Sequence, residues 1–389
     1  MANFNIQEDF IDYWDEVIRQ WLSLNANVTG FKGLATEQSN VIKAINENCD
    51  YDKNYIINTI HMPEPYWGNP LEKCSIVLLD YNPAGGARIN RHTTINCKEC
   101  NGFCGEDNKM TVIRYVNEKK KYSDLALKCP VLKEYDDLKW FSDKDNGYEG
   151  YNWWQEKRKW LNHLVNTICG SNAYELLPFG IELCGWHSKK WSNNMKWIDK
   201  EIKDCKIKDC IKKRAIQPLF AAMKNSLGDS PVKIAVCIGA EFKPKLLCNF
   251  FDSDTFKDVT KEIKLSKQDL GKKENPLYEK YKDLSYSLEN EEENIHVIAK
   301  WTETKKNGKT DYKKTNRNYR IYKITEDINN KKKNYYILNT HYSGSNSHPG
   351  EHFWPFEDVL IGKIKEYDLG IAYNNPSKHP TSHQVERVK

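Results

Sequence analysis

Four short apolar runs, far apart in the chain, restrict most strongly which folds this sequence can adopt. Each holds four to six apolar or β-branched residues and then stops at polar, glycine or proline residues. The runs are SIVLLDYNP, AYELLPF, KIAVCIGAEF and YYILNTHYSG, which end at Pro83, Phe179, Phe242 and Gly344. A continuous apolar run, unlike an alternating one, is typical of a strand buried on both faces. We therefore expect four interior strands.

Helix-like segments separate the expected strands. Apolar residues recur at helical spacing over residues 10–24, and similar segments cover Glu156–Cys169 and Cys210–Leu227. Strands that alternate with helices favour a parallel sheet with helices on both sides. The carboxyl ends of parallel strands meet at one edge of the sheet, where ligands bind. We therefore expect the polar residues that follow the four runs to form one site.

Composition excludes several classes of protein. The 389 residues include 12 Trp, 22 Tyr and 13 Phe, which is too aromatic for a wholly disordered chain. No run approaches the roughly 18–20 apolar residues that span a bilayer. The first residues are acidic where a signal peptide needs a basic and then an apolar stretch. We expect a soluble cytoplasmic protein without a membrane partner, in which most of the 12 cysteines are buried thiols.

Changes in composition along the chain predict its organisation. Residues 1–60 form an N-terminal helical segment, and residues 61–373 form one α/β domain. Two charged stretches, about 90–151 and 252–334, interrupt the pattern of that domain and are interpreted as long insertions. The last residues, 374–389, are polar and are expected to form a disordered tail.

Positive charge is concentrated in one part of the chain. The formal net charge is +5, yet residues 300–333 hold 12 Lys or Arg against 4 acidic residues, a local excess of 8. A local basic excess favours a polyanion partner, and nucleic acid is the commonest one. A solvated lysine-rich hairpin with no ligand explains the same pattern.

The residues at the run ends suggest a family. LLDYNPAGG, AVCIGAEF and THYSGSNSHPGEHFWPF resemble, in this order, motifs of the uracil-DNA glycosylase superfamily. The resemblance is confined to short segments of the chain. It implies a three-layer α/β/α sandwich with a four-stranded, mainly parallel central sheet, here carrying the two long insertions. It also implies an enzyme that flips a nucleotide out of DNA and hydrolyses its N-glycosidic bond.

The resemblance assigns the catalytic roles. His341 would donate a hydrogen bond to the departing base, where negative charge develops, and Asn82 would orient the attacking water. The classical motif has Asp at position 82, so carboxylate assistance is absent there. Asp80, two residues earlier, is the alternative carboxylate, or a structural acceptor at a strand end. No lysine stands at a nucleophile position, so we expect a monofunctional glycosylase without lyase activity.

Two departures from the classical motifs bear on the substrate. Ala84 and Gly85 replace the tyrosine that excludes C5 substituents, which leaves space beside C5 of a pyrimidine. Glu175 stands where the family reads uracil with Asn, and a carboxylate accepts hydrogen bonds from the cytosine amine. Together they favour a C5-modified cytosine, such as glucosylated hydroxymethylcytosine in phage DNA. Glu175 is equally compatible with a buried structural role.

Further residues are candidates for holding the flipped nucleotide. Tyr81 and Phe179 are either stacking partners of the base or ordinary core residues. Ser343 and Ser345 are small hydroxyl donors suited to phosphate oxygens.

One dense cysteine group suggests a metal. Cys97, Cys100 and Cys104 stand in CKECNGFC, and thiolates at this spacing suit a structural zinc ion or an iron–sulfur cluster. A closed site needs a fourth ligand, for which Cys129 and His92 are candidates. Catalysis by the proposed route requires no cofactor.

The sequence therefore predicts a DNA glycosylase that acts on a modified or mismatched pyrimidine in phage defence or DNA repair, with DNA as partner and no obligatory protein partner. The alternative is a module that binds modified DNA or nucleotide without cleaving it. A nucleotide-hydrolysing enzyme is a weaker third class, because NPAGGA lacks the Lys and Ser/Thr of a phosphate-binding loop.

Overall fold

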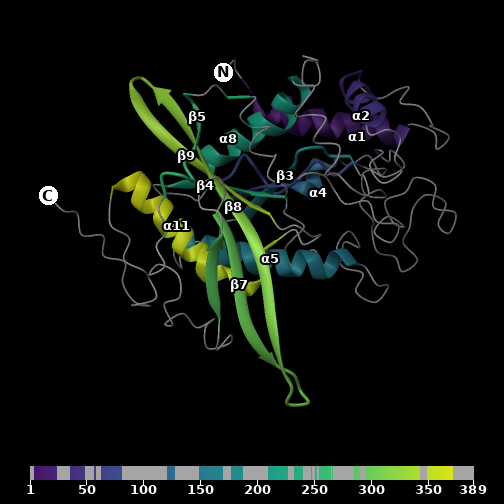
Figure 1. Cartoon of the computed structure of the whole chain (residues 1–389). Helices are drawn as coiled ribbons and strands as arrows, with labels where there is room; N and C mark the ends of the chain where they lie inside the picture. The colour runs from purple at the N-terminus through teal and green to yellow at the C-terminus, as the bar shows by residue number, and fades with distance from the viewer. Residues whose placement is uncertain are drawn as a thin grey trace.

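A single mixed sheet runs through the computed structural model of the chain (Figure 1). Its nine strands follow the order β1-β3-β2-β4-β9-β8-β7-β6, and β5 pairs with β8 outside this path. The strands are β1 Tyr66–Trp67, β2 Cys74–Asp80, β3 Leu177–Glu182, β4 Lys233–Ile238, β5 Phe256–Asp258, β6 Ser285–Glu289, β7 Ile295–Thr304, β8 Thr310–Ile328 and β9 Lys331–His341. The structure describes residues 4–23, 36–48, 57, 63–80, 121–127, 149–169, 177–186, 209–226, 232–239, 247, 250–251, 254–263, 265, 284–289, 295–341 and 348–370.

The prediction of a four-stranded, mainly parallel sheet is wrong. Five of the eight strand pairings are antiparallel, and only β3-β2, β2-β4 and β4-β9 are parallel. The reason lies in residues 252–334, which were interpreted as an insertion. They supply β5, β6, β7 and β8, which extend the same sheet beyond β9. Tight turns join β7, β8 and β9, and strands joined in this way pair antiparallel.

The parallel strands occupy the interior. Every residue of β2 and of β4 is buried, as expected for strands covered on both faces. By contrast, β8 begins with alternating exposed and half-buried residues and becomes buried only near its middle. The continuous apolar runs therefore mark the covered part of the sheet, and the alternating ones mark its solvated extension.

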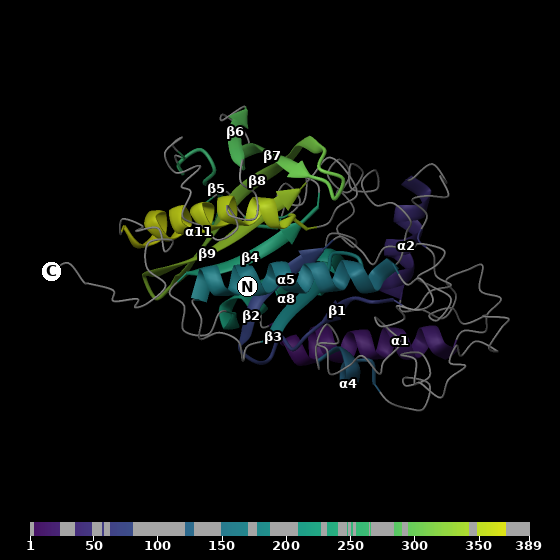
Figure 2. The same ribbon diagram turned by 90° about the horizontal axis from the view of Figure 1, so that it is seen from below.

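Helices cover both faces of the parallel strands (Figures 1 and 2). On one face, α5 and α11 lie side by side and pack against residues such as Ile76, Leu78 and Leu338. On the other face, the N-terminal helices and α8 pack against Val77, Leu79 and neighbouring residues. The helices are η1 Gln7–Asp12, α1 Tyr13–Ser23, α2 Thr36–Asn48, α4 Ser123–Ala126, α5 Glu149–Cys169, η3 Lys212–Ile216, α8 Gln217–Asn225, η4 Glu351–Phe353 and α11 Trp354–Leu369.

The helix predicted over residues 10–24 is observed as η1 followed by α1. Its apolar side packs into the core through Phe10, Trp14, Val17 and Trp21. The N-terminal segment is therefore one of the elements that cover the sheet. No helix among the described residues has both the length and the apolar character that a membrane crossing demands.

Candidate functional site

Four neighbouring strands end together at one polar edge of the sheet. Asp80 and Glu182 are register partners, and so are Ile238 and Thr340. The pairing of β2 with β4 continues this row, so that the last residue of β2 lies beside the last residue of β4. We call the residues at these strand ends the carboxyl edge, and they are Glu182, Asp80, Gly239 and His341.

Two carboxylates lie next to each other on the carboxyl edge. Asp80 is 9 % exposed and Glu182 is 8 % exposed, and neighbouring strands place their backbones only about 4.8 Å apart. Both side chains follow the alternation of Ile76 and Leu78, which face α5 and α11. A pair of carboxylates on one face is suited to acid and base catalysis.

His341 belongs to the opposite face of the sheet, because it continues the series of Tyr335 and Ile337. Asn318 is its register partner on β8, and His296 is in turn the partner of Asn318 on β7. Asn318 bridges the two rings. Its amide Nδ2 lies 3.3 Å from His341 Nε2, and its Oδ1 contacts His296 Nδ1.

The contacts that link His296, Asn318 and His341 determine which ring nitrogen of His341 carries the proton. Nδ2 of Asn318 is a donor, so Nε2 of His341 accepts from it. The proton of a neutral His341 ring then lies on Nδ1, which is a buried atom. Asn318 therefore positions the imidazole and fixes its tautomer.

Gly239 lies between the carboxylates and the imidazole. Asp80 and His341 are two strands apart, so their backbones are separated by roughly 10 Å. Gly239 is on the intervening strand and has φ +122°, a conformation that favours glycine. A ligand lying beyond the strand ends would contact Asp80 from one face and His341 from the other.

Most of the predicted site lies outside the described residues, and those predictions stay predictions. Of the catalytic and substrate-binding residues, the structure describes Asp80, Phe179 and His341. The others are Asn82, Tyr81, Ala84, Gly85, Glu175, Ser343 and Ser345.

The second strand is displaced along the chain relative to its predicted position. The run Ala173–Phe179 was expected to end at Phe179, whereas β3 continues to Glu182. Phe179 is consequently fully buried, with its ring centroid 6.4 Å from that of Tyr66 and 6.5 Å from that of Phe10. It packs in the core, and Glu182 is the carboxylate at this strand end.

A buried polar network supports the carboxyl edge from the side of α11. Arg317 is 2 % exposed and donates from Nε to Thr340 Oγ1 at 2.7 Å. Glu357 accepts from Trp160 Nε1 at 2.8 Å and from the hydroxyl of Tyr319 at 3.0 Å. Complete burial raises the pKa of Glu357 to about 7, although both hydrogen bonds oppose the shift. The network fixes β8, α5 and α11 to one another.

His352 lies beside this network, in the segment that leads into α11. Its ring stacks on Trp301 with centroids 4.4 Å apart, and its carbonyl accepts from Tyr286 Oη at 2.6 Å. Burial, reinforced by the positive charge of Arg317, lowers the pKa of His352 to about 4. The ring is therefore neutral at pH 7 and can accept or donate a hydrogen bond.

A small pocket lies where α1 and α2 meet the segment that directly follows β3. Burial raises the pKa of the Cys184 thiol to about 12 and raises that of Cys210 well above its usual range. Neither thiol is therefore a nucleophile at neutral pH. The pocket is lined by Trp14, Gln38, Val41, Ile45, Leu183, Cys184, Gly185, Cys210, Ile211 and Arg214.

Several residues that the fold brings to this region were not selected from the sequence. Glu182, Arg317 and Asn318 stand in no motif, and their importance comes from register alone. A signal for Glu182 was present, because the apolar residues Ile181 and Leu183 follow Gly180 and extend the strand. The register that pairs Asn318 with His341 cannot be inferred from a single sequence.

The predicted metal ligands Cys97, Cys100 and Cys104 lie outside the described residues, so the zinc prediction stays a prediction. Within the described part of the chain, no three His, Cys, Asp or Glu side chains gather as a metal site. The five cysteines described there are free thiols, namely Cys74, Cys169, Cys184, Cys210 and Cys237.

Comparison with known proteins leaves the site to be judged on its own geometry. No family model, no curated protein and no solved structure matches the chain.

Proposed function

We propose that this protein hydrolyses the N-glycosidic bond of a modified or mismatched pyrimidine in DNA and leaves an abasic site. One observation carries the proposal. The ends of neighbouring parallel strands bring two carboxylates, Asp80 and Glu182, and an oriented imidazole, His341, to one edge of the sheet. The segments that follow β2 and β9 in the sequence resemble the glycosylase motifs and add support.

The chemistry needs groups of these kinds. The bond between the sugar C1′ carbon and the base nitrogen breaks, and the oxygen of a water molecule bonds to C1′. The base departs with the electron pair and takes up a proton. His341 would donate from Nδ1 to the base as negative charge develops. Asp80, assisted by Asn82, would orient the water and accept its proton.

The preferred base is proposed to be a C5-modified cytosine, for example a glucosylated hydroxymethylcytosine. The small side chain of Ala84 and the acceptor character of Glu175 support this choice. Such a substrate places the protein in antiviral defence, whereas a thymine or uracil mismatch places it in DNA repair.

The test is a base-release assay on the full chain. The substrates are duplexes with uracil, a thymine mismatch, hydroxymethylcytosine or glucosylated hydroxymethylcytosine, and free base is quantified by mass spectrometry. We expect His341→Ala and Asp80→Asn each to lower the rate 100-fold or more, in the range typical of lost acid–base assistance. Asp327→Asn is the matched control, because this carboxylate stands on the exposed tip of another hairpin.

A DNA-binding module without catalysis is the second candidate. Asp80 and His341 project from opposite faces of the sheet. This arrangement suits binding of a ligand from two sides better than catalysis by two groups that face each other. Under this alternative, modified DNA binds tightly and no base is released from any of the four substrates. Release of base that persists unchanged in both site variants contradicts the assigned roles.

A further inference from the structure

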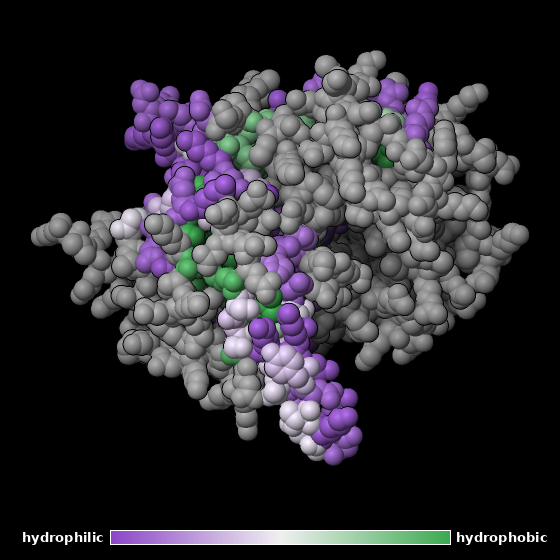
Figure 3. All heavy atoms as spheres, in the orientation of Figure 1, coloured by the Kyte–Doolittle hydropathy of each residue, from purple (hydrophilic) through white to green (hydrophobic). Residues whose placement is uncertain are grey.

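The hairpin formed by β7 and β8 projects beyond its neighbours (Figure 1). Pairing of β6 with β7 ends at Lys300, and pairing of β9 with β8 ends at Asn318. Residues 301–304 and 310–313 therefore pair only with each other. We call residues 300–316 the β7–β8 arm, and Figure 3 shows it as a hydrophilic projection from the body of the protein.

Alternation along the strands gives the arm two chemically different faces. The odd-numbered face carries both of its acidic residues, Glu303 and Asp311, directly opposite each other. Two lysines neutralise this pair. Lys305 lies 2.6 Å from Asp311, and Lys313 lies 3.7 Å from Glu303 and 4.0 Å from Asp311. The odd face is electrostatically satisfied within the protein.

The even-numbered face has no carboxylate. Lys300 and Lys314 are directly opposite each other on it, and like charges in this arrangement repel. Among the described residues, neither lysine has an acidic partner within ion-pair distance. Tyr312, on the same face, is 67 % exposed. The even face consists of Lys300, Thr302, Thr304, Thr310, Tyr312, Lys314 and Asn316.

The even face continues without interruption to the carboxyl edge. His296 and Asn318 follow the same alternation on β7 and β8, and Asn318 contacts His341. Lys314 is four residues from Asn318, a distance of roughly 13 Å along a strand. That length corresponds to about four base-pair steps of B-DNA at 3.4 Å each.

We propose that the even face of the β7–β8 arm binds the sugar–phosphate backbone of duplex DNA and leads it to His341. Lysine, hydroxyl and amide groups are the usual phosphate contacts, and an exposed tyrosine adds a flat surface for sugar or base. A two-stranded ribbon also matches the width of the major groove. The choice of DNA as the ligand rests on the proposed function, whereas the choice of face rests on the charges of the arm.

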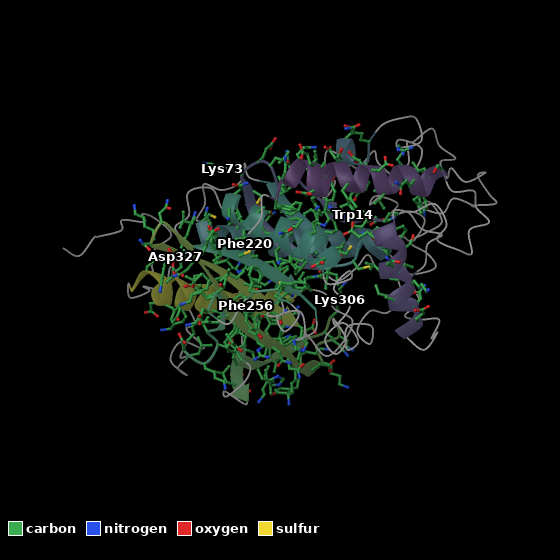
Figure 4. All side chains as sticks on the ribbon, turned by 90° about the horizontal axis from the view of Figure 1, so that it is seen from above. Trp14, Lys73, Phe220, Phe256, Lys306 and Asp327 are labelled. Carbon is green, nitrogen blue, oxygen red and sulfur yellow. The ribbon has the colours of Figure 1, made fainter. Side chains whose placement is uncertain are left out.

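The hairpin at the other end of β8 provides a contrast. There Lys332 is directly opposite Asp327, and Lys333 is directly opposite Glu326. The ion pair of Glu326 is with Lys224, at 2.5 Å, and the three lysines at 331–333 outnumber the two carboxylates by one, so this hairpin carries a smaller cationic excess than the arm. Figure 4 shows Lys306 and Asp327, which mark the two hairpins, on different sides of the molecule. Residues 300–316 hold six lysines against two carboxylates, so the arm carries half of the local basic excess of 8.

The experiment compares two double variants with the same change of net charge. Lys300→Ala with Lys314→Ala removes the even-face cations, and Lys305→Ala with Lys313→Ala removes the odd-face cations. Binding of the full chain to a fluorescent 20-base-pair unmodified duplex is measured by anisotropy from 50 to 200 mM salt. We expect the even-face variant to bind at least tenfold more weakly at 100 mM salt. The slope of log affinity against log salt should lose about 2, since each phosphate contact contributes about 0.9.

Two outcomes overturn the proposal. Equal losses in both variants would mean that total charge alone matters, and unchanged binding in the even-face variant would mean that DNA lies elsewhere. A second measurement on the unmodified protein avoids any folding defect of a variant. DNA should protect Lys300 and Lys314 from acylation more than Lys305 and Lys313, and equal protection contradicts the proposal.

The same data separate this proposal from the proposed function. If the even-face variant loses DNA binding while no substrate releases a base, the proposal for the arm is supported and the proposed glycosylase activity is contradicted. If base is released and the even-face variant binds DNA normally, the proposed activity is supported and the proposal for the arm is contradicted.

Discussion

The two halves of the sheet differ in how far their side chains are buried. In the parallel half, β2 and β4 are buried along their whole length between two layers of helices. In the antiparallel half, β7 and β8 extend past their neighbours into solvent, and the far residues pair only with each other. The same sheet thus contains a packed interior and a projecting ribbon.

This contrast separates where the fold is stabilised from where a partner can be recognised. Interior side chains contribute through apolar burial, which depends on volume and shape. Side chains of the β7–β8 arm bury little, so their charges are available to a ligand. Substitutions in the first half should change stability, and those in the second should change binding.

The largest effect is expected from Leu338→Ala in the parallel half. Leu338 is fully buried between its register partners Val236 and Ile321. Loss of the side chain leaves a cavity and should cost about 2–5 kcal/mol of the free energy of unfolding. Urea denaturation provides the measurement, with Tyr312→Ala on the arm as control at under about 0.5 kcal/mol. Equal losses would contradict the distinction between the halves.

A pH-dependent effect is expected at the boundary between the halves, where Glu357 contacts Tyr319. Its folded-state pKa of about 7 lies above the ordinary value of 4.5. As pH rises from about 4.5 to 7, the unfolded chain releases this proton before the folded protein does. The folded state is therefore destabilised across this window, by at most about 3 kcal/mol.

Glu357→Gln removes this titration. The stability of the variant relative to the unmodified protein should rise between pH 5 and pH 7.5, as measured by urea unfolding at several pH values. Leu338→Ala is the control, because it lowers stability without altering a titrating group. Parallel pH profiles for the unmodified protein and Glu357→Gln would show that another group dominates.

A smaller effect is expected at the turn between β8 and β9. Asn329 and Asn330 have φ of 53° and 63°, the left-handed conformation that this type of two-residue turn needs. Asn330→Ala should cost about 1 kcal/mol, because alanine tolerates positive φ poorly. Asn330→Gly should be close to neutral. Thermal unfolding of the two variants checks this, and equal destabilisation would argue against backbone conformation as the cause.

The smallest effect is expected from Lys314→Ala on the arm. Removing one of two opposed lysines relieves their repulsion and should stabilise the protein by a few tenths of a kcal/mol. The effect should disappear in high salt, because screening weakens the repulsion between exposed charges. Urea unfolding at 20 mM and 500 mM salt measures it, and a loss of stability at low salt would contradict the repulsion.

The sequence was sufficient to locate the buried strands but insufficient to define the sheet. Continuous apolar runs marked β2, β4 and β9 because burial on both faces requires apolar residues at every position. The antiparallel strands were not predicted because β7 and β8 carry many lysines and polar residues. Such a pattern suits a solvated insertion as well as a strand. Their place in the sheet depends on pairing with β9, which is a long-range property.

The candidate site was only partly predictable for the same reason. Asp80 and His341 each end an apolar run, so their positions on the carboxyl edge follow from local pattern. Glu182 required the true end of β3, which a proline and a glycine inside the strand obscured. Asn318 required the register between β8 and β9, which is fixed by a turn and by core packing on distant residues.

The length of the β7–β8 arm can change only in certain steps if its chemistry is to persist. Side chains alternate between faces with a period of two, so removing two residues from each strand shortens the reach and leaves every remaining residue on its face. Removing one from each strand exchanges the faces and puts Glu303 and Asp311 where the lysines were. Related chains with shorter or longer arms should therefore differ by even numbers of residues per strand.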